Sequence, residues 1–492
     1  MAREDRIEKY LWIALLLLVP VSSSPLLPLG EGTLIRPLSF VPALLLVAIA
    51  GIRFLFLNQR PNFSRDNGCF ATLLCFAAYV LASGLASVAF LPDDLFKGQA
   101  PLDSFLRGFL TLVIGIIFYS LARLHIRSRA DLLLAEKCLF LGIGASIALA
   151  VYQVAAIYAG GDALREAQAI TDLFAVRTTG LTIRAQGMGL EASALGYQIA
   201  VLLIPFLVAR SVSRQASVGL PKQKMIWVVL PGTLLALVGL LSAGSRFGIA
   251  SAIAIVGLSA LRALWRGRVF AVFALAAMVA AGGVGAAYLS NLRVGAGATY
   301  VTNVVPGLIE LSVSDLDDRD QTAVLSDAVS VSGRVAAWQS ATGVWLDNPL
   351  FGISLGNTYR YFGKYAPDWA LDSLLFNQRA SEGAAWLDPN APEKANAKNL
   401  AVRLLAETGL VGTALFLLFF LRHVTWGSPD AYAGAFRVAA VAAVCLNWLN
   451  SDTFADPAMW IVLALCHATG RIGEPGRYAV GSPAASQAAA AA

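Results

Sequence analysis

Residues 69–90 read CFATLLCFAAYVLASGLASVAF, an apolar run that contains no charged side chain. About 20 such residues are enough for a helix to cross the hydrocarbon core of a bilayer, which is about 30 Å thick. The chain as a whole is 57% hydrophobic and 14% charged, whereas about 25% of the residues in a soluble domain are charged. Because backbone groups in lipid have to be paired within the spanning element, the sequence predicts an all-α integral membrane protein.

Similar runs recur along the 492 residues and predict about 12 transmembrane helices. The first nine helices would occupy residues 1–289, a large and partly helical loop residues 290–399, and the last three helices residues 400–471. Residues 472–492 are low in sequence complexity, which predicts a disordered cytoplasmic tail. The predicted spans are 11–28, 37–57, 69–90, 108–122, 138–158, 192–209, 226–242, 247–262, 269–289, 400–421, 433–449 and 456–470.

The distribution of basic residues predicts the orientation of these spans, because short cytoplasmic segments are enriched in Lys and Arg. With the N-terminus in the cytoplasm, the cytoplasmic segments carry 20 Lys and Arg residues and the short outer loops carry 7. We therefore expect both termini to be cytoplasmic and the large loop to be periplasmic.

Charged side chains near the ends of the spans are candidates for function, because charge is costly to keep at a membrane. Arg184 and Glu191 lie in RAQGMGLEASALG, just before the sixth span, and Arg246 lies in LSAGSRFG, a turn between two spans. Arg334 opens a predicted amphipathic helix over residues 334–346. The predicted catalytic residues are Arg246, Arg184 and Glu191, and the predicted substrate-binding residues are Arg334, Arg177, Lys398, Asn399 and Glu407.

Several arginines on one membrane face suit a diphosphate, because the guanidinium group binds phosphate oxygens as a planar fork. Such arginines also stabilise the negative charge that grows on a departing lipid diphosphate. Glu407 follows Arg403 by four residues, so an ion pair on one helix face is the alternative for these two. The three histidines all fall on the predicted cytoplasmic side. A periplasmic base would then be a carboxylate such as Glu191, another loop group or water.

The sequence predicts neither a metal nor a cofactor. The five cysteines lie in or beside apolar runs and lack the spacing of zinc ligands. The acidic stretch SDLDDRD (residues 314–320) lacks the Gly and the terminal Glu of a calcium loop. No nucleic-acid partner is expected either.

Four stretches of the chain resemble the O-antigen ligase and Wzy-type polysaccharide polymerase superfamily. They share its Arg/Gly-rich loop with Glu-x-Ser, its Ser-Arg turn, its loop helix followed by Asp-x-Pro-Leu-x-Gly, and its Glu-x-Gly-x-x-Gly span. The ending SDTFADPAMWIVLAL (residues 451–465) is also similar. The four stretches are RAQGMGLEASALGYQIAVL (184–202), LSAGSRFGIASAIA (241–254), GRVAAWQSATGVWLDNPLFGISLGNTY (333–359) and KNLAVRLLAETGLVGTALFLL (398–418).

This resemblance implies a GT-C-like membrane fold and a glycan linked to undecaprenyl diphosphate as the donor. It also implies that Arg184, Arg246 and Arg334 engage the diphosphate or the sugar. The chain departs from the family at two places. Glu191 is followed by Ala where exopolysaccharide polymerases commonly have Pro, and Lys398 stands in a stretch where ligases carry a His. The second departure favours a polymerase.

The expected function is a metal-independent glycosyltransferase in a bacterial inner (cytoplasmic) membrane, which polymerises lipid-linked O-antigen or exopolysaccharide repeat units. Its partners would be undecaprenyl-diphosphate-linked glycan and membrane lipid, together with a chain-length regulator and a flippase. The first alternative is a ligase that transfers the polymer to lipid A-core or to a protein. The second is a transporter or flippase of a lipid-linked glycan, for which the one-sided placement of the charges is unfavourable.

Overall fold

The computed structural model describes residues 3–27, 35–58, 68–91, 94–176, 184–212, 222–265, 334–367, 394–424 and 431–472. Over these ranges the regular secondary structure is helical, apart from isolated bridge pairs such as Phe96 with Gln99. Eight of the described helices are long and apolar enough to cross a membrane. The predicted all-α, multi-pass membrane class is therefore confirmed.

Most predicted spans fall on described helices. The exception is 269–289, which lies outside the described residues, as do residues 290–333 and 368–393 of the predicted large loop and residues 473–492 of the predicted tail. The predicted loop helix is present as helical residues 334–347. The other helices are α1 (Arg3–Leu18), α2 (Phe40–Leu57), α3 (Gly68–Val88), α4 (Pro101–His125), α5 (Arg129–Ala159), α6 (Gly161–Asp172), α7 (Ala192–Gln198), η1 (Ile199–Leu203), α8 (Ile204–Val212), α9 (Lys222–Ala243), α10 (Arg246–Trp265), η4 (Thr358–Tyr361), α13 (Phe362–Tyr365), α17 (Leu400–Leu421), α18 (Ala431–Trp448) and α19 (Pro457–Ile472).

The first helix ends earlier than the sequence predicted. α1 stops at Leu18, whereas the predicted span continues to residue 28. Pro20 follows and cannot donate a backbone hydrogen bond, which ends the helix. The chain beyond it pairs elsewhere, since Ser24 donates its N–H to the carbonyl of Arg36 over 2.8 Å.

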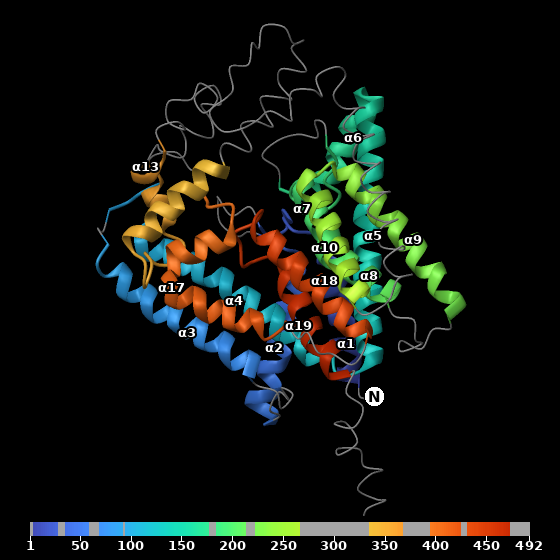
Figure 1. Cartoon of the computed structure of the whole chain (residues 1–492), viewed down its shortest axis with the longest axis horizontal. Coiled ribbons are helices and arrows are strands. Elements are labelled where there is room, and N and C mark those ends of the chain that lie inside the picture. Colours follow the sequence, from blue (N-terminus) through green and yellow to red (C-terminus); the bar gives the residue numbers. More distant parts are fainter. Residues whose placement is uncertain are drawn as a thin grey trace, which may run out of the picture.

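The described helices run up and down through one bundle (Figure 1). The N-terminus lies at the lower end in this view, and α6 and α13 lie at the upper end. Arg262 near the end of α10 donates to the carbonyl of Gly434 near the start of α18, so these two helices are antiparallel. At the other end, Leu400 at the start of α17 donates to the carbonyl of Ser451, just after α18. The start of α17 therefore lies beside the end of α18, and the start of α10 lies towards the same, upper end.

Helix α17 is interrupted at Gly409, where φ is 64° and ψ is −170°. The loop that follows the helix 334–347 supplies partners for the interrupted turn. Leu410 donates its N–H to the carbonyl of Pro349 (2.8 Å), and Val411 donates to that of Leu350 (3.2 Å). A Cβ on Gly409 would lie 2.2 Å from the carbonyl oxygen of Leu350. Glycine is therefore required there both for the positive φ and for the close approach.

The same pairing continues one turn earlier in α17. Ile353 donates its N–H to the carbonyl of Ala406 (3.0 Å), and Ser354 donates to that of Glu407 (3.1 Å). A Cβ on Gly352 would lie 2.4 Å from the backbone of Glu407. The Asp-x-Pro-Leu-x-Gly and Glu-x-Gly-x-x-Gly stretches are thus two sides of one backbone interface.

The central span is Ala192–Val212, of which 83% is buried. It contains the π-helical turn η1, and Pro205 follows this turn closely without an N–H to donate. Lower in the same span, Arg210 makes a bidentate ion pair with Glu136 of α5, with N–O distances of 2.5 and 2.8 Å. Both side chains are buried, so each charge is compensated by the other.

Helices α4 and α19 pack closely through a glycine. A Cβ on Gly115 of α4 would lie 2.1 Å from the indole of Trp460, whose side chain is fully buried. The indole N–H also donates to the carbonyl of Phe454 (2.6 Å), which fixes the ring in this position.

We expect Gly115→Ala to destabilise the protein by about 1–3 kcal/mol, because the new methyl group overpacks the core against Trp460. The measurement is the midpoint of thermal unfolding of the purified protein in detergent. Gly51→Ala is the matched control, since Gly51 is also helical and a Cβ there meets nothing within 4 Å. Equal midpoints for the two variants would contradict the packing argument.

Candidate functional site

The segment 184–191, which carries Arg184 and Glu191, is held by a buried glutamine. The side-chain oxygen of Gln153 on α5 accepts from the N–H groups of Gln186 and Gly187, each over 2.9 Å. Its side-chain nitrogen donates to the carbonyl of Gly187 (3.1 Å) and to the hydroxyl of Thr171 (2.8 Å). One side chain therefore uses all its usual donors and acceptors to fix this non-helical segment.

The same segment lies against the turn between α9 and α10. Ala185 donates its N–H to the carbonyl of Ser242 near the end of α9 (3.4 Å). A Cβ on Gly248 of α10 would lie 2.9 Å from the Cα of Gly196 on α7, so the first turns of these helices touch. Glu191 directly precedes α7, and Arg246 begins α10. The structure thus brings these two predicted catalytic positions to adjacent helix ends.

Arg184 and Glu191 are exposed, and Glu191 accepts a hydrogen bond from the hydroxyl of Ser193. Ser245 caps α10 by accepting from the N–H of Gly248 (3.1 Å). The backbone of Arg246 is described, whereas its side chain lies outside the described part of the structure, as does the whole of Arg177.

A second set of predicted residues converges on the segment 449–456, which joins α18 to α19. Arg334 donates from Nη1 to the side-chain oxygen of Asn450 over 2.7 Å. Lys398, whose φ is 47°, donates its backbone N–H to the carboxylate of Asp452 over 3.1 Å. Segment 449–456 is therefore the point at which the loop helix and the start of α17 meet.

Asn399 and Glu407 on α17 already have partners within the chain. The side-chain oxygen of Asn399 caps the helix by accepting from the N–H groups of Ala401 and Val402 (3.0 and 3.2 Å). Glu407 is 3% exposed and accepts from Arg403 Nε (2.7 Å) and from the hydroxyl of Thr358 (2.8 Å). The ion pair considered from the sequence is present, and a contact of Glu407 with substrate stays a prediction.

Arg403 connects this pair to segment 449–456, because its Nη1 donates to the carbonyl of Asp452 over 2.5 Å. Asp456 lies at the other end of the same segment, within electrostatic range of Tyr197 on α7. Burial raises the pKa of Asp456 to about 6, while its hydrogen bond from Ala458 N–H and the nearby Tyr197 hydroxyl act in the opposite direction. Segment 449–456 thus reaches from the loop helix to the neighbourhood of α7.

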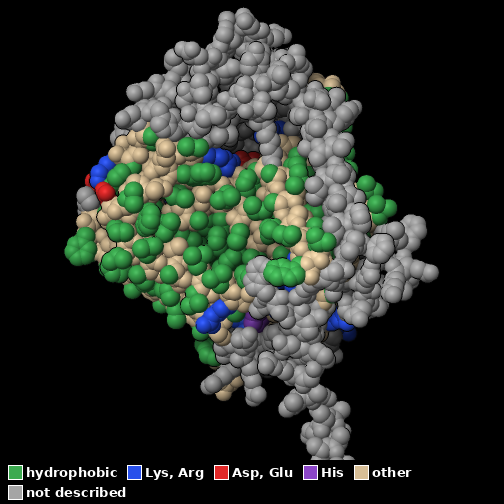
Figure 2. Space-filling model, viewed as in Figure 1, with side chains coloured by type: hydrophobic (Ala, Val, Ile, Leu, Met, Phe, Trp, Pro, Cys, Tyr) green, Lys and Arg blue, Asp and Glu red, His purple; other side chains and the backbone are tan. Residues whose placement is uncertain are grey.

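Figure 2 shows basic and acidic side chains gathered at a recess near the upper end, above a broad apolar band. This distribution fits a bundle that keeps its charged groups at a membrane surface. Within the ranges that the structure describes, no group of three or more His, Cys, Asp or Glu side chains is arranged to hold a metal ion.

The sequence did not assign roles to Gln153, Asn450, Asp452 or Asp456. Asn450, Asp452 and Asp456 could have been found from the sequence, because they lie in or beside SDTFADPAMWIVLAL, the stretch that is similar to the C-terminal part of the family. Gln153 lies within an apolar span, and only the path of segment 184–191 in space reveals its contacts.

Residues 231–417 match the family model described as O-antigen ligase. A search of curated proteins finds no match to the chain. The match confirms the resemblance predicted from the sequence motifs, and members of this family are membrane enzymes that process glycans. The matched range includes Arg246, Arg334, Lys398, Asn399 and Glu407.

We expect Glu407→Gln to destabilise the protein by about 3 kcal/mol, because it leaves the Arg403 charge without its carboxylate partner. Chemical denaturation in detergent measures the change. Glu191→Gln, which alters an exposed carboxylate, is the control and should change stability by less than about 0.5 kcal/mol. If Glu407→Gln is as stable as the wild type, the ion pair does not support the fold and Glu407 is available to a substrate.

Proposed function

We propose that this protein polymerises lipid-linked oligosaccharide repeat units of an O-antigen or exopolysaccharide. Arg334 and the backbone of Lys398 contact segment 449–456. Asp456 of the same segment lies near Tyr197 on α7.

Glu191 and Arg246 stand at the adjacent ends of α7 and α10, at the same end of the apolar bundle. These two observations support the proposal, and three of the four stretches concerned lie within or overlap the family match. A fixed polar site at one membrane face is what a transfer reaction between lipid-linked substrates requires.

In the proposed reaction, an acceptor sugar hydroxyl attacks the anomeric carbon of the donor glycan. The bond from that carbon to undecaprenyl diphosphate breaks, and the diphosphate leaves with the electron pair. Arg184, Arg246 and Arg334 would stabilise its negative charge, which makes the reaction independent of a metal. Arg177, Lys398, Asn399 and Glu407 would bind the remainder of the substrates.

The acceptor hydroxyl has to lose a proton as the new bond forms. Glu191 is one candidate, because it is exposed at the start of α7. Asp456 is the second, because a carboxylate with a pKa of about 6 is largely ionised at neutral pH and still basic enough to take a proton.

The ligase alternative rests on the description of the matching family model. The proposal favours a polymerase because Lys398 occupies the stretch in which ligases carry a histidine, and its N–H is bonded to Asp452. We place the protein in a bacterial inner membrane with cytoplasmic termini, so that the upper end of the bundle is periplasmic. A chain-length regulator and a flippase would then act beside it.

Deletion of the gene in its host should cause single lipid-linked repeat units to accumulate, because polymerisation stops after assembly of the unit. The lipid-linked intermediates are extracted and sized by mass spectrometry. Long lipid-linked polymers would instead identify a ligase. An unchanged profile in a strain without a redundant gene would contradict both functions.

Complementation with Arg246→Ala should lower polymer formation about 100-fold or more, as expected when a group that stabilises the leaving charge is removed. Arg165→Ala is the matched control, because Arg165 is an exposed arginine that is paired with Asp162 one turn away. Both variants must reach the membrane at the wild-type level. Full activity of Arg246→Ala at that level would remove the arginine mechanism.

The rate of the purified enzyme should fall as the pH drops through about 6, because the protonated Asp456 carboxyl group cannot accept a proton. In Asp456→Asn the rate should be about 100-fold lower near pH 7 and should lose this acidic limb. An acidic limb that persists in Asp456→Asn would assign the proton acceptor to another group, with Glu191→Gln as the next variant to measure.

A further inference from the structure

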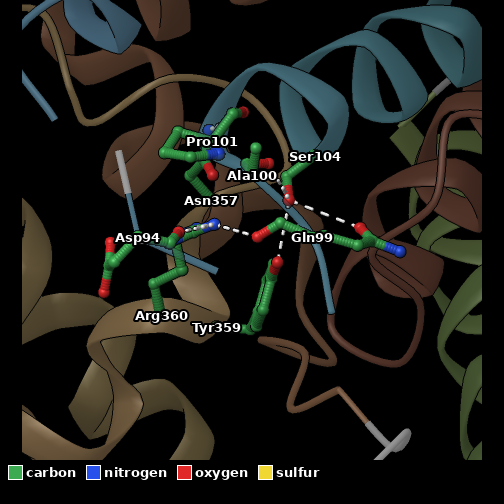
Figure 3. Close-up of polar contacts among 8 residues, drawn as sticks. All are labelled: Asp94, Gln99, Ala100, Pro101, Ser104, Asn357, Tyr359 and Arg360. Atoms are coloured by element: carbon green, nitrogen blue, oxygen red, sulfur yellow. Dashed lines mark hydrogen bonds and ion pairs between the residues drawn. The ribbon is translucent and has the colours of Figure 1, made fainter. Parts of the chain in front are cut away.

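The chain between the loop helix and α13 reaches down from the upper end of the bundle along α4. At its top, Asn357 donates from Nδ2 to the carbonyl of Pro101 (3.1 Å). The hydroxyls of Tyr359 and Ser104 share a hydrogen bond of 2.7 Å (Figure 3). Pro101 and Ser104 both belong to the first turn of α4. This part of the chain is therefore fixed at the level where α4 begins.

The preceding residues lie lower on the same helix. A Cβ on Gly108 would lie 3.1 Å from the carbonyl oxygen of Leu355. Gly108 comes about two helical turns after Pro101, which is about 10 Å along the axis of α4. Leu355 therefore lies well below the upper end of this helix.

The tip of the segment is paired with the middle of two further spans. Leu350 accepts a hydrogen bond from the N–H of Val411, just after the interruption of α17 (3.2 Å). Thr408, just before the interruption, accepts from the hydroxyl of Tyr79 over 2.9 Å. Tyr79 lies near the middle of α3, which is long and apolar enough to cross a membrane. The tip therefore lies between the levels of the two ends of α3.

The thickness of a bilayer gives the same depth independently. The part of α17 after Gly409, residues 410–421, is about 18 Å long. It ends beside Arg422, which is exposed and, as a charged residue, marks the lower edge of the hydrocarbon core. Because that core is about 30 Å thick, about 12 Å of it extends above Gly409, to the level of residues 349–355.

The side chains at the tip are suited to this depth. Leu350 and Phe351 are 53% and 58% exposed, and Leu410 and Val411 beside them on α17 are 46% and 38% exposed. Leu346, at the end of the loop helix, is 64% exposed. The backbone pairing of the tip with α17 makes these side chains one apolar surface, continuous with the exposed side of a membrane span.

Towards α13, at the upper end, the surface becomes polar. Lys364 donates to the carboxylate of Asp347 (3.1 Å) and to the hydroxyl of Tyr365 (2.7 Å), and both charged side chains are exposed. Trp345 donates its indole N–H to the carbonyl of Pro349 (3.3 Å). Trp and Tyr are typical of the boundary between lipid and water, so this boundary lies just above the tip.

Irregular backbone is tolerated at membrane depth only where the protein supplies its hydrogen-bond partners. Gly352 donates its N–H to the carbonyl of Asn348 (3.1 Å), and Ile353 and Ser354 donate theirs to carbonyls of α17 (3.0 and 3.1 Å). Pro349 has no N–H to satisfy. The backbone of the segment therefore meets this requirement at these positions.

We propose that residues 346–355 form a re-entrant segment, which enters the hydrocarbon region and contacts lipid acyl chains through Leu346, Leu350 and Phe351. The segment pairs with the backbone of the buried Glu407 and so separates this carboxylate from the lipid. The inference uses the depth of the segment and no step of the proposed reaction, so it does not depend on the proposed function.

The test is the accessibility of a nitroxide spin label on the full-length protein in phospholipid nanodiscs. Oxygen concentrates in hydrocarbon, whereas a neutral nickel chelate stays in water. The label is attached to Phe351→Cys and, in a separate variant, to Leu346→Cys. The background carries Cys75→Ala and Cys445→Ala, which removes the two exposed native thiols among the five free cysteines.

The label at Phe351→Cys should collide with the nickel chelate about tenfold less often than a label at Arg165→Cys, because a polar complex is excluded from hydrocarbon. Arg165 on α6 is the aqueous control, with its side chain 82% exposed. Leu417→Cys is the lipid control, because Leu417 is exposed on the membrane span α17. The label at Phe351→Cys should match it in access to oxygen.

Lipid-like accessibility at either labelled position, in a variant with the wild-type unfolding midpoint, supports the inference. Nickel access at both positions equal to that of Arg165→Cys would place the segment in water and overturn the inference. Shielding of both positions from oxygen as well as from nickel would also overturn it, because protein would then cover the segment. The activity of Arg246→Ala tests the proposed function separately.

Discussion

Lipid offers no hydrogen-bond partner to a polypeptide backbone, and this constraint decides where the chain can leave a helix. Each irregular segment described above has its own source of partners. Gln153 serves segment 184–191, and residues 349–354 serve the interrupted turn of α17 at Gly409. Both sources lie towards the upper end of the bundle. The non-helical backbone that can surround a substrate is therefore concentrated where buried side chains or a second stretch of chain support it.

The two ends of the bundle differ in the partners of their arginine side chains. Towards the lower end, Arg210 and Glu136 neutralise each other in a closed pair. At the upper end, Arg334 reaches a neutral amide on Asn450, and Arg403 shares its charge between Glu407 and a backbone carbonyl. Cations paired with neutral groups keep more of their attraction for an incoming anion than cations paired with carboxylates. Arg334, whose partner is an amide, therefore keeps more attraction for an anion than Arg210 or Arg403, each of which is paired with a carboxylate.

Local sequence determined the helices but not their mutual contacts. Apolar runs such as residues 69–90 predict spans because a membrane helix is defined mainly by its length and composition. The predicted first span, 11–28, runs past Pro20, and the structure ends α1 before this proline, at Leu18. The glycines of the Asp-x-Pro-Leu-x-Gly and Glu-x-Gly-x-x-Gly stretches were visible. That Gly352 and Gly409 meet in one interface depends on pairing across more than 50 residues, which no local pattern encodes. The side-chain position of Arg246 and the whole of Arg177 lie outside the described residues.

The π-turn η1 changes the direction in which the side chains that follow it point from the central span. A π-turn holds one residue more than an α-turn, so every side chain after it is rotated about the helix axis by the angle of one residue, about 100°. With that extra residue, Arg210 on α8 faces Glu136, while α7 keeps Gly196 against α10. Removal of one residue from Ile199–Leu203 would turn one of these faces away from its neighbour. The parts of the span before and after η1 therefore point their side chains in directions that differ by about 100°. A relative without this π-turn would need a compensating change in one of the two helix contacts.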